Sequence, residues 1–145
     1  MIVAVLHGPN LNLLGRREPD VYGRTTLAEI DARVAALAAE LGVHLETFQA
    51  NGEGALIDFV QGAAQRVAGF VVNAGGYTHT SVALLDALVG TGLPFVEVHL
   101  SNLHAREPFR QTSLLAPRAA GIVLGFGASG YELALRGLVA HLRAD

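Results

Sequence analysis

Side chains that could act as acids, bases or anion ligands gather in a few short stretches of the sequence. Three of these stretches follow apolar runs directly, and a fourth holds an arginine and a tyrosine close together. They span residues 7–10, 16–24, 73–80 and 97–102. Their His, Tyr and Glu side chains can transfer protons, while their Arg, Asn and Ser side chains can bind oxygens and carboxylates. The sequence therefore predicts a polar site built from these four stretches.

Two residue types are absent, and their absence narrows the possible chemistry. The chain has no cysteine, and all ten of its cationic side chains are arginine. Catalysis through a lysine Schiff base or a cysteine thiolate is therefore impossible, as is a phosphate loop that needs a lysine. Metal sites built on cysteine are excluded too.

Residues 16–24 have the composition of a loop that closes over a pocket. The segment contains three arginines, a tyrosine and a proline, and nothing apolar enough to bury firmly. Arg17 and Tyr22 are near in sequence, and a guanidinium beside a phenol favours the phenolate. The plainer alternative is a solvated connection whose tyrosine packs on the surface.

The elements that must position these stretches alternate along the chain. Short runs rich in β-formers alternate with stretches of helical apolar spacing, which is typical of a doubly wound parallel sheet. Thr26 with Glu29 and Ser129 with Glu132 have the spacing of capping boxes, and Gly42 is a helix stop. The expected strands are 2–6, 43–48, 69–73, 95–99 and 122–126, and the expected helices are about 27–41, 56–67, 81–89 and 131–142.

This alternation predicts a single catalytic domain over residues 1–145 with a flavodoxin-like fold. The expected sheet has five parallel strands in the order 2-1-3-4-5, with helices on both faces. Strands one, three and four are then neighbours, so the polar residues that follow them share one crevice at the strand ends. The irregular connection 101–120 is the longest, and such connections are often functional.

Composition bears on partners and location. Charged residues make up only 16% of the chain, against about 25% in an average domain. We therefore expect helices to bury much of each sheet face and other copies of the chain to bury part of the surface. The net charge of −3 argues against a nucleic-acid binding partner. No apolar run approaches the roughly 18 residues of a membrane helix, so we expect no membrane partner and a cytoplasmic location.

Four linked motifs carry a resemblance to a known family. They are GPNLNLLG at 8–15 with REP at 17–19 and YG at 22–23, NAGGYTHTS at 73–81, EVHLSN at 97–102, and ARE at 105–107 with FR at 109–110. In this order and spacing they resemble the type II 3-dehydroquinate dehydratases, a family of lyases that work without a cofactor or metal.

The resemblance implies a role for each matching residue. Tyr22 would abstract a C2 proton of 3-dehydroquinate, and Arg17 would favour its phenolate and stabilise the transition state. Asn10 would hold a water at the resulting enolate, and His99 would protonate the departing C1 hydroxyl in an anti elimination. The family's product, 3-dehydroshikimate, belongs to the shikimate pathway towards chorismate and aromatic amino acids, or to quinate catabolism.

The other matching positions would bind substrate or support the site. The implied substrate-binding residues are Asn73, His79, Asp86, Leu100, Ser101 and Arg110, with Asp86 reaching the site of a neighbouring subunit. The implied supporting residues are Pro9, Gly75, Glu97 and Arg106. Glu97 would orient His99, since residues two apart point to the same face of a strand, and Arg106 would pair with carboxylates of the loop or an interface. The family forms homododecamers built from trimers.

Other readings of the same residues remain open. His99 could be a hydrogen-bonded strand residue, His79 a helix cap, Asp86 part of a solvated face and Gly75 part of a tight turn. His7, His44, His104 and His141 match no role in the family, and we interpret them as structural. A nucleotide- or flavin-binding module, a metal hydrolase built on Glu97, His99 and His104, and a structural assembly protein are the alternative functions. A receiver-type domain would need an aspartate where Asn73 stands, together with a lysine.

Overall fold

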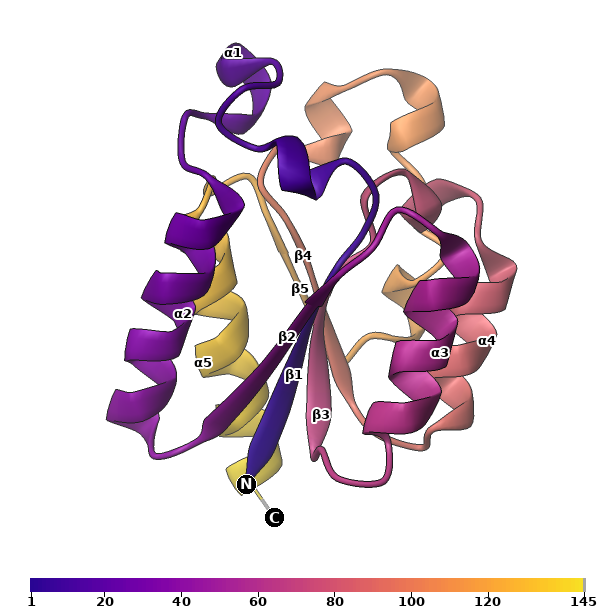
Figure 1. Cartoon of the computed structure of the whole chain (residues 1–145). Helices are drawn as coiled ribbons and strands as arrows, with labels where there is room; N and C mark the ends of the chain where they lie inside the picture. Colours follow the sequence, from indigo (N-terminus) through magenta and orange to yellow (C-terminus); the bar gives the residue numbers. More distant parts are fainter. Residues whose placement is uncertain (145) are drawn as a thin grey trace.

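A computed structural model gives the positions of residues 1–144 and shows a parallel sheet between two layers of helices (Figure 1). The strands are arranged in the order β2-β1-β3-β4-β5, and every neighbouring pair is parallel. This confirms the predicted flavodoxin-like topology. The strands are β1 (Ile2–His7), β2 (His44–Gln49), β3 (Gly69–Asn73), β4 (Phe95–His99) and β5 (Gly121–Leu124).

Two separate apolar cores hold the helices on the sheet. Helices α2 (Leu27–Leu41) and α5 (Ser129–Arg143) cover one face, and α3 (Glu53–Ala63) and α4 (Val82–Gly90) cover the other (Figure 1). Side chains alternate between the faces along each strand. In β1, for example, Val3 and Val5 belong to the core under α2 and α5, while Ala4 and Leu6 belong to the core under α3 and α4.

Several predicted boundaries shift by a few residues. The prediction for β5 extended to Phe126, but the strand ends at Leu124 because Gly125 and Gly127 both have positive φ, which turns the chain away from the sheet. The second predicted helix was expected to reach Val67, whereas α3 ends at Ala63 and a turn follows it.

Of the two predicted capping boxes, one has its N-cap hydrogen bond. The Thr26 hydroxyl accepts a hydrogen bond from the Glu29 amide at 3.2 Å, as expected for an N-cap. Ser129 is not a cap: α5 begins at this residue, Ala128 holds the N-cap position, and the Ser129 hydroxyl accepts from Arg33 instead. Capping-box spacing alone placed this cap one residue too late.

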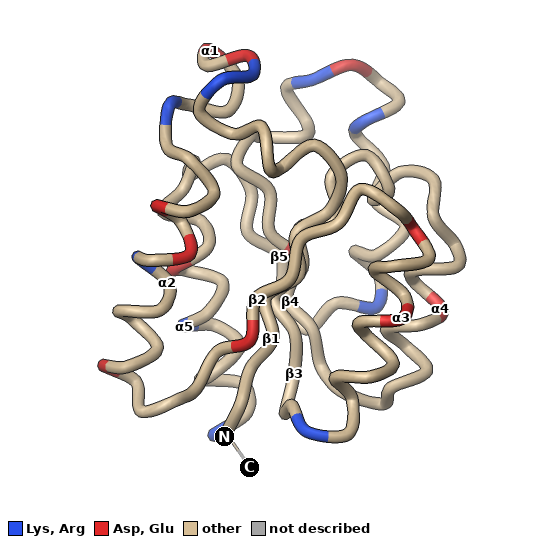
Figure 2. Tube along the Cα trace, in the orientation of Figure 1, with Lys and Arg blue, Asp and Glu red and all other residues tan. Residues whose placement is uncertain are grey.

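The long connections lie at the carboxyl end of the sheet. The loop 16–24 contains a single helical turn, α1 (Pro19–Tyr22), and the chain between β4 and β5 contains three short 3-10 helices, η3 (Leu103–Ala105), η4 (Pro108–Arg110) and η5 (Ala116–Arg118). Both connections rise above the strand ends, where arginines gather (Figure 2). Across residues 1–144, no helix is both long and apolar enough to cross a membrane.

Candidate active site

The ends of β1, β3 and β4 form the floor of one cavity of about 190 Å³. The loop 16–24 and the β4–β5 connection complete its walls. A wider open cleft adjoins the cavity and shares several lining residues with it. The cavity is lined by Pro9, Asn10, Leu11, Arg17, Tyr22, Asn73, Gly75, Gly76, His79, His99, Leu100, Ser101, Leu103, Arg106 and Arg110. The predicted convergence of four separate stretches is therefore observed.

Two turns that pack against each other shape one end of the cavity. The Gly8 amide donates to the Asn73 carbonyl at 2.7 Å, and there is no room for a side chain at Gly8. Asn10 follows in the left-handed conformation, with φ 69°, which asparagine tolerates better than most residues. Gly75 also has positive φ, and its backbone lies against Pro9. These contacts fix the predicted supporting residues Pro9 and Gly75 beside Asn10.

Tyr22 contacts two arginines. The guanidinium carbon of Arg17 is 5.0 Å from the centre of the tyrosine ring, and that of Arg106 is 5.2 Å away. Arg106 also donates a hydrogen bond to the Tyr22 hydroxyl at 3.0 Å. A predicted role for Arg106 was pairing with carboxylates of the loop or an interface, but its loop contact is the phenol. Its nearest carboxylate is the adjacent Glu107, at 3.7 Å.

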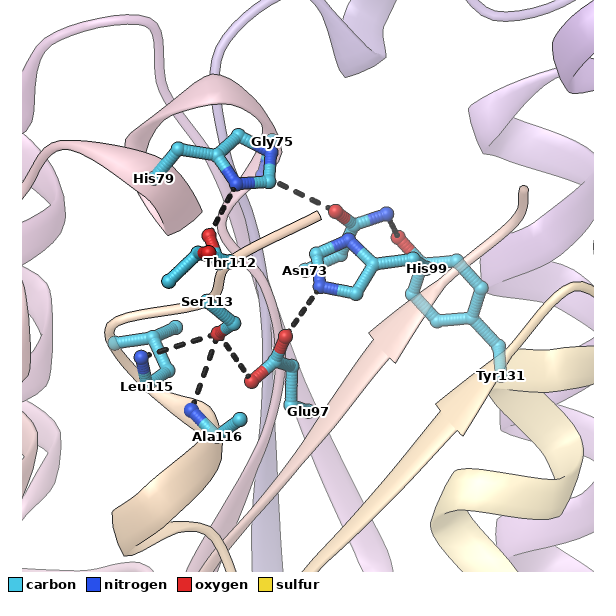
Figure 3. A network of polar contacts seen from close by, with 10 residues as sticks. All are labelled: Asn73, Gly75, His79, Glu97, His99, Thr112, Ser113, Leu115, Ala116 and Tyr131. Carbon is cyan, nitrogen blue, oxygen red and sulfur yellow. Dashed lines mark hydrogen bonds and ion pairs between the residues drawn. The ribbon is translucent and has the colours of Figure 1, made fainter. Parts of the chain in front are cut away.

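His99 is buried at the end of β4 and is paired with Glu97. His99 Nε2 lies 2.6 Å from Glu97 Oε2, which confirms the predicted contact between side chains on the same strand face. The carboxylate is fully buried, and its other oxygen accepts from the Ser113 hydroxyl at 2.8 Å (Figure 3). Glu97 therefore lies behind His99, on the side away from the cavity.

Asn73 is the inner end of a buried polar chain. Its side-chain oxygen accepts from the Gly75 amide, and its side-chain nitrogen donates to the Tyr131 hydroxyl at 3.0 Å (Figure 3). His7 lies 3.0 Å from the same hydroxyl through Nδ1 and 2.8 Å from Asp31 through Nε2. Complete burial raises the pKa of Tyr131 well above its ordinary value, so this phenol keeps its proton.

The remaining predicted residues divide into two groups. His79, Leu100, Ser101 and Arg110 line the cavity, and Glu107 pairs with Arg110 at 2.9 Å, which lowers the pKa of the glutamate. Asp86 does not line it. This residue is exposed on α4, in a shallow hollow away from the strand ends.

Some residues that support the site were not predicted. Ser113 and Tyr131 contact site residues directly, and Gln49 and Asn51 bond the backbone of the Gly8–Asn10 turn. Of these four residues, only Ser113 had a signal in the sequence that suggested a function, because it lies in the long irregular connection 101–120. His7 was predicted to be structural, and it belongs to the buried chain above, while His44, His104 and His141 are exposed.

The geometry does not support the alternative metal site. His104 is exposed on η3, while Glu97 is fully buried and already pairs with His99 and Ser113. Within residues 1–144, no three His, Asp or Glu side chains gather closely enough to hold a metal ion.

The fold and the cavity are those of an α/β enzyme whose polar site lies at the carboxyl ends of its strands. Comparison with known proteins identifies its family. The family model described as "Dehydroquinase class II" matches residues 1–139. The chain is 58% identical over 143 residues to the 3-dehydroquinate dehydratase of Synechococcus sp. (strain WH7803), covering 99% of this chain and 97% of the relative. The chain belongs to the class II dehydroquinase family.

Other relatives and solved structures agree. The 3-dehydroquinate dehydratase of Desulforudis audaxviator is 60% identical over 139 residues, covering 96% of this chain and 93% of the relative. The crystal structure of the type II dehydroquinase from Butyrivibrio crossotus superposes with a TM-score of 0.93 at 38% identity, covering 95% of this chain and 97% of the other. These matches span almost the whole of each protein compared.

Proposed function

We propose that this enzyme dehydrates 3-dehydroquinate to 3-dehydroshikimate, with Tyr22 as the base and His99 as the acid. The observation that carries the proposal is the presence of both side chains in one cavity, each with a partner that suits its role. Tyr22 contacts two guanidinium groups, and His99 contacts a buried carboxylate. A cation beside a phenol favours the phenolate, and a carboxylate beside an imidazole favours the imidazolium.

The proposed reaction is an elimination through an enolate. The Tyr22 phenolate removes a proton from C2, and the electron pair of the C–H bond moves towards the C3 ketone. The electrons then form the C1–C2 double bond as the C1 hydroxyl leaves, protonated by His99 to give water. A positioned base and a positioned acid each contribute roughly 10²–10⁴-fold to the rate of such a reaction. Asn10 would hold the water that stabilises the enolate oxygen.

The other residues of the cavity suit an anionic polyhydroxylated ring. Asn73, His79 and Arg110 would bind the ring oxygens, and Ser101 with the backbone amides of Leu100 and Ser101 would receive the carboxylate. Arginines concentrate in the two connections above the strand ends (Figure 2), so a carboxylate substrate is attracted to this end of the sheet. Residues 16–24 would act as a lid that closes over the bound ring.

The exposed position of Asp86 agrees with a role outside this subunit's own cavity. We propose that it contributes to the site of a neighbouring copy in a dodecamer built from trimers. The mass of the protein in solution tests the assembly, and an Asp86→Ala variant tests the contribution. A monomer with full activity would contradict both parts of this proposal.

The activity can be tested directly, because the product contains a conjugated enone that absorbs in the ultraviolet. Purified protein is expected to convert 3-dehydroquinate without added metal or coenzyme, before and after borohydride treatment. Tyr22→Phe and His99→Ala are each expected to lower kcat by at least 100-fold. His104→Ala, which removes an exposed histidine from the same connection, is the control and is expected to keep full activity. Full turnover in Tyr22→Phe would disprove the role of the base.

The cellular role is a separate part of the proposal. We propose that the enzyme serves the shikimate pathway, and the same reaction would also support quinate breakdown. Deletion of the gene separates these roles, because loss of biosynthesis creates a requirement for aromatic amino acids, whereas loss of catabolism prevents growth on quinate.

A further inference from the structure

The segment between η4 and η5 contacts one histidine of the cavity, His79, and the glutamate that pairs with the other, His99. The Thr112 carbonyl accepts a hydrogen bond from His79 Nδ1 at 2.8 Å, and the next residue, Ser113, contacts the glutamate behind His99 (Figure 3). The Leu114 amide donates to the Thr78 carbonyl at 2.9 Å, which ties the segment to the turn after β3. A short irregular stretch of the long connection therefore reaches two parts of the site at once.

The Ser113 hydroxyl has three partners, and their chemistry fixes the direction of its hydrogen. The amides of Leu115 and Ala116 both lie 3.1 Å from Ser113 Oγ, and a backbone amide can only donate. These two bonds occupy both lone pairs of the hydroxyl oxygen. The single hydroxyl hydrogen must therefore go to the third partner, Glu97 Oε1, at 2.8 Å.

This direction determines how Glu97 meets His99. Donation to Oε1 stabilises the carboxylate form of the fully buried glutamate. Glu97 Oε2 then accepts from His99 Nε2, 2.6 Å away, so the hydrogen of the neutral imidazole lies on Nε2. The second ring nitrogen, Nδ1, remains to exchange a proton with a ligand in the cavity. The same carboxylate stabilises the imidazolium that an acid catalyst requires.

We propose that Ser113 is a positioning residue for His99, acting through Glu97 to set the tautomer and the proton affinity of the imidazole. The catalytic part of this inference rests on the proposed function. Charged or titratable groups that line the same cavity are Tyr22, Arg17 and Arg106, together with His79 and Arg110. None of these is replaced in the test, so their fields act equally in every variant.

The test compares Ser113→Ala with Ser113→Thr, which keeps the hydroxyl. For Ser113→Ala we expect kcat to fall by about 10–100-fold, the size of effect seen when the hydrogen-bond partner of a metal-bound histidine is removed, while KM changes less. The alkaline limb of the kcat profile should move to lower pH, because the imidazolium loses part of its stabilisation. Ser113→Thr should recover most of kcat and the original profile.

A control and a second variant keep the test decisive. Thr91→Ala removes a hydroxyl that likewise accepts from one backbone amide near a helix end, far from the cavity, and should leave kcat and its pH profile unchanged. If Ser113→Ala does not fold, Ser113→Cys replaces it, since a thiol is a weak donor of similar shape, and a reduced kcat with a shifted profile is again expected. Wild-type kcat and profile in the folded variant would overturn the proposal.

The tautomer can also be read without turnover. In protein labelled with ¹⁵N at histidine, the His99 signals should show the Nε2–H tautomer in the wild type and a mixture in Ser113→Ala. This readout separates the two proposals, because it retains its meaning even if 3-dehydroquinate is not converted. An unchanged, pure Nε2–H signal in Ser113→Ala would show that Ser113 does not set the tautomer.

Discussion

Arg106 Nη1 donates a hydrogen bond to the Tyr22 hydroxyl at 3.0 Å, although 84 positions separate the two residues in the sequence. The contact joins the loop 16–24 to the connection between β4 and β5. Arg106 also reaches the Ser101 hydroxyl, at 3.4 Å, so one guanidinium links the proposed base to the proposed carboxylate-binding residue. The loop therefore packs over the strand ends with its tyrosine already paired.

Replacement of Arg106 should weaken the proposed base. In Arg106→Ala the phenol loses its hydrogen-bond donor and one of two nearby cations, so we expect kcat to fall by about 10–100-fold. KM should change less than kcat, because the contact is made with the proposed base. Arg118→Ala, which removes an exposed arginine from η5, should leave kcat unchanged. Wild-type kcat in Arg106→Ala would mean that this arginine does not assist the tyrosine.

Tyr131 should make the protein sensitive to alkali. Burial raises the pKa of this phenol in the folded state above its unfolded value of 10.0. The folded state therefore favours the protonated form, and its stabilising effect is complete below pH 10 and is lost as the pH rises further. Denaturant unfolding between pH 8 and pH 11, compared with Tyr131→Phe, measures this effect.

The phenylalanine variant carries a cost of its own. At neutral pH it should be less stable by about 1–3 kcal/mol, because Asn73 and His7 each lose a buried partner. Above pH 10 the difference between the two proteins should shrink. A constant difference over the whole range would show that the Tyr131 hydroxyl does not titrate on unfolding.

Gly8 should tolerate no side chain. A Cβ at this position would lie 2.4 Å from the Ala74 carbonyl oxygen, which belongs to the backbone after β3. Gly8→Ala should therefore destabilise the protein by about 1–3 kcal/mol and reduce kcat by separating the two turns. Gly62→Ala, on an exposed part of α3 with open space around it, should instead stabilise by about 0.5–1 kcal/mol. Equal stability of the two variants in thermal unfolding would contradict the packing described.

Thr26 and Ser129, which lie at the starts of two helices, should contribute differently to stability. Thr26→Ala removes the N-cap of α2 and should cost about 1 kcal/mol. Ser129→Ala removes an exposed contact with Arg33 and no cap, so it should cost less than about 0.5 kcal/mol. Chemical denaturation of both variants tests the cap assignment, and equal losses would restore Ser129 as a capping residue.

The sequence predicts the parts of this protein that depend on local periodicity. Apolar strands such as Gly69–Asn73 and the helical spacing from Leu27 to Leu41 give the alternation from which a doubly wound sheet was predicted. The observed strand order brings Tyr22 and His99 to one cavity. The Glu97–His99 pair follows from strand geometry, because residues two apart share a face.

The contacts of irregular segments and buried polar groups could not be predicted. The positions of the Arg106 and Ser113 side chains depend on the path of the connection 101–120 over the sheet. No periodicity in the sequence predicts that path. His7 lies in an apolar strand, and its partners Asp31 and Tyr131 are 24 and 124 positions away. The early end of β5 depends on two glycines with positive φ, which sequence spacing does not reveal.

The contacts of the turn at Thr112–Ala116 support the proposed site. It has no strand or α-helix to hold it, yet its amides direct the hydrogen of Ser113 and its carbonyl holds His79. Substitution of Ser113 is thus expected to lower activity more than stability, whereas substitution of Leu115, which is fully buried in the core under α3 and α4, is expected to lower stability. Inactive natural variants that fold well are therefore expected to include substitutions in this stretch, and not only at residues that touch the substrate.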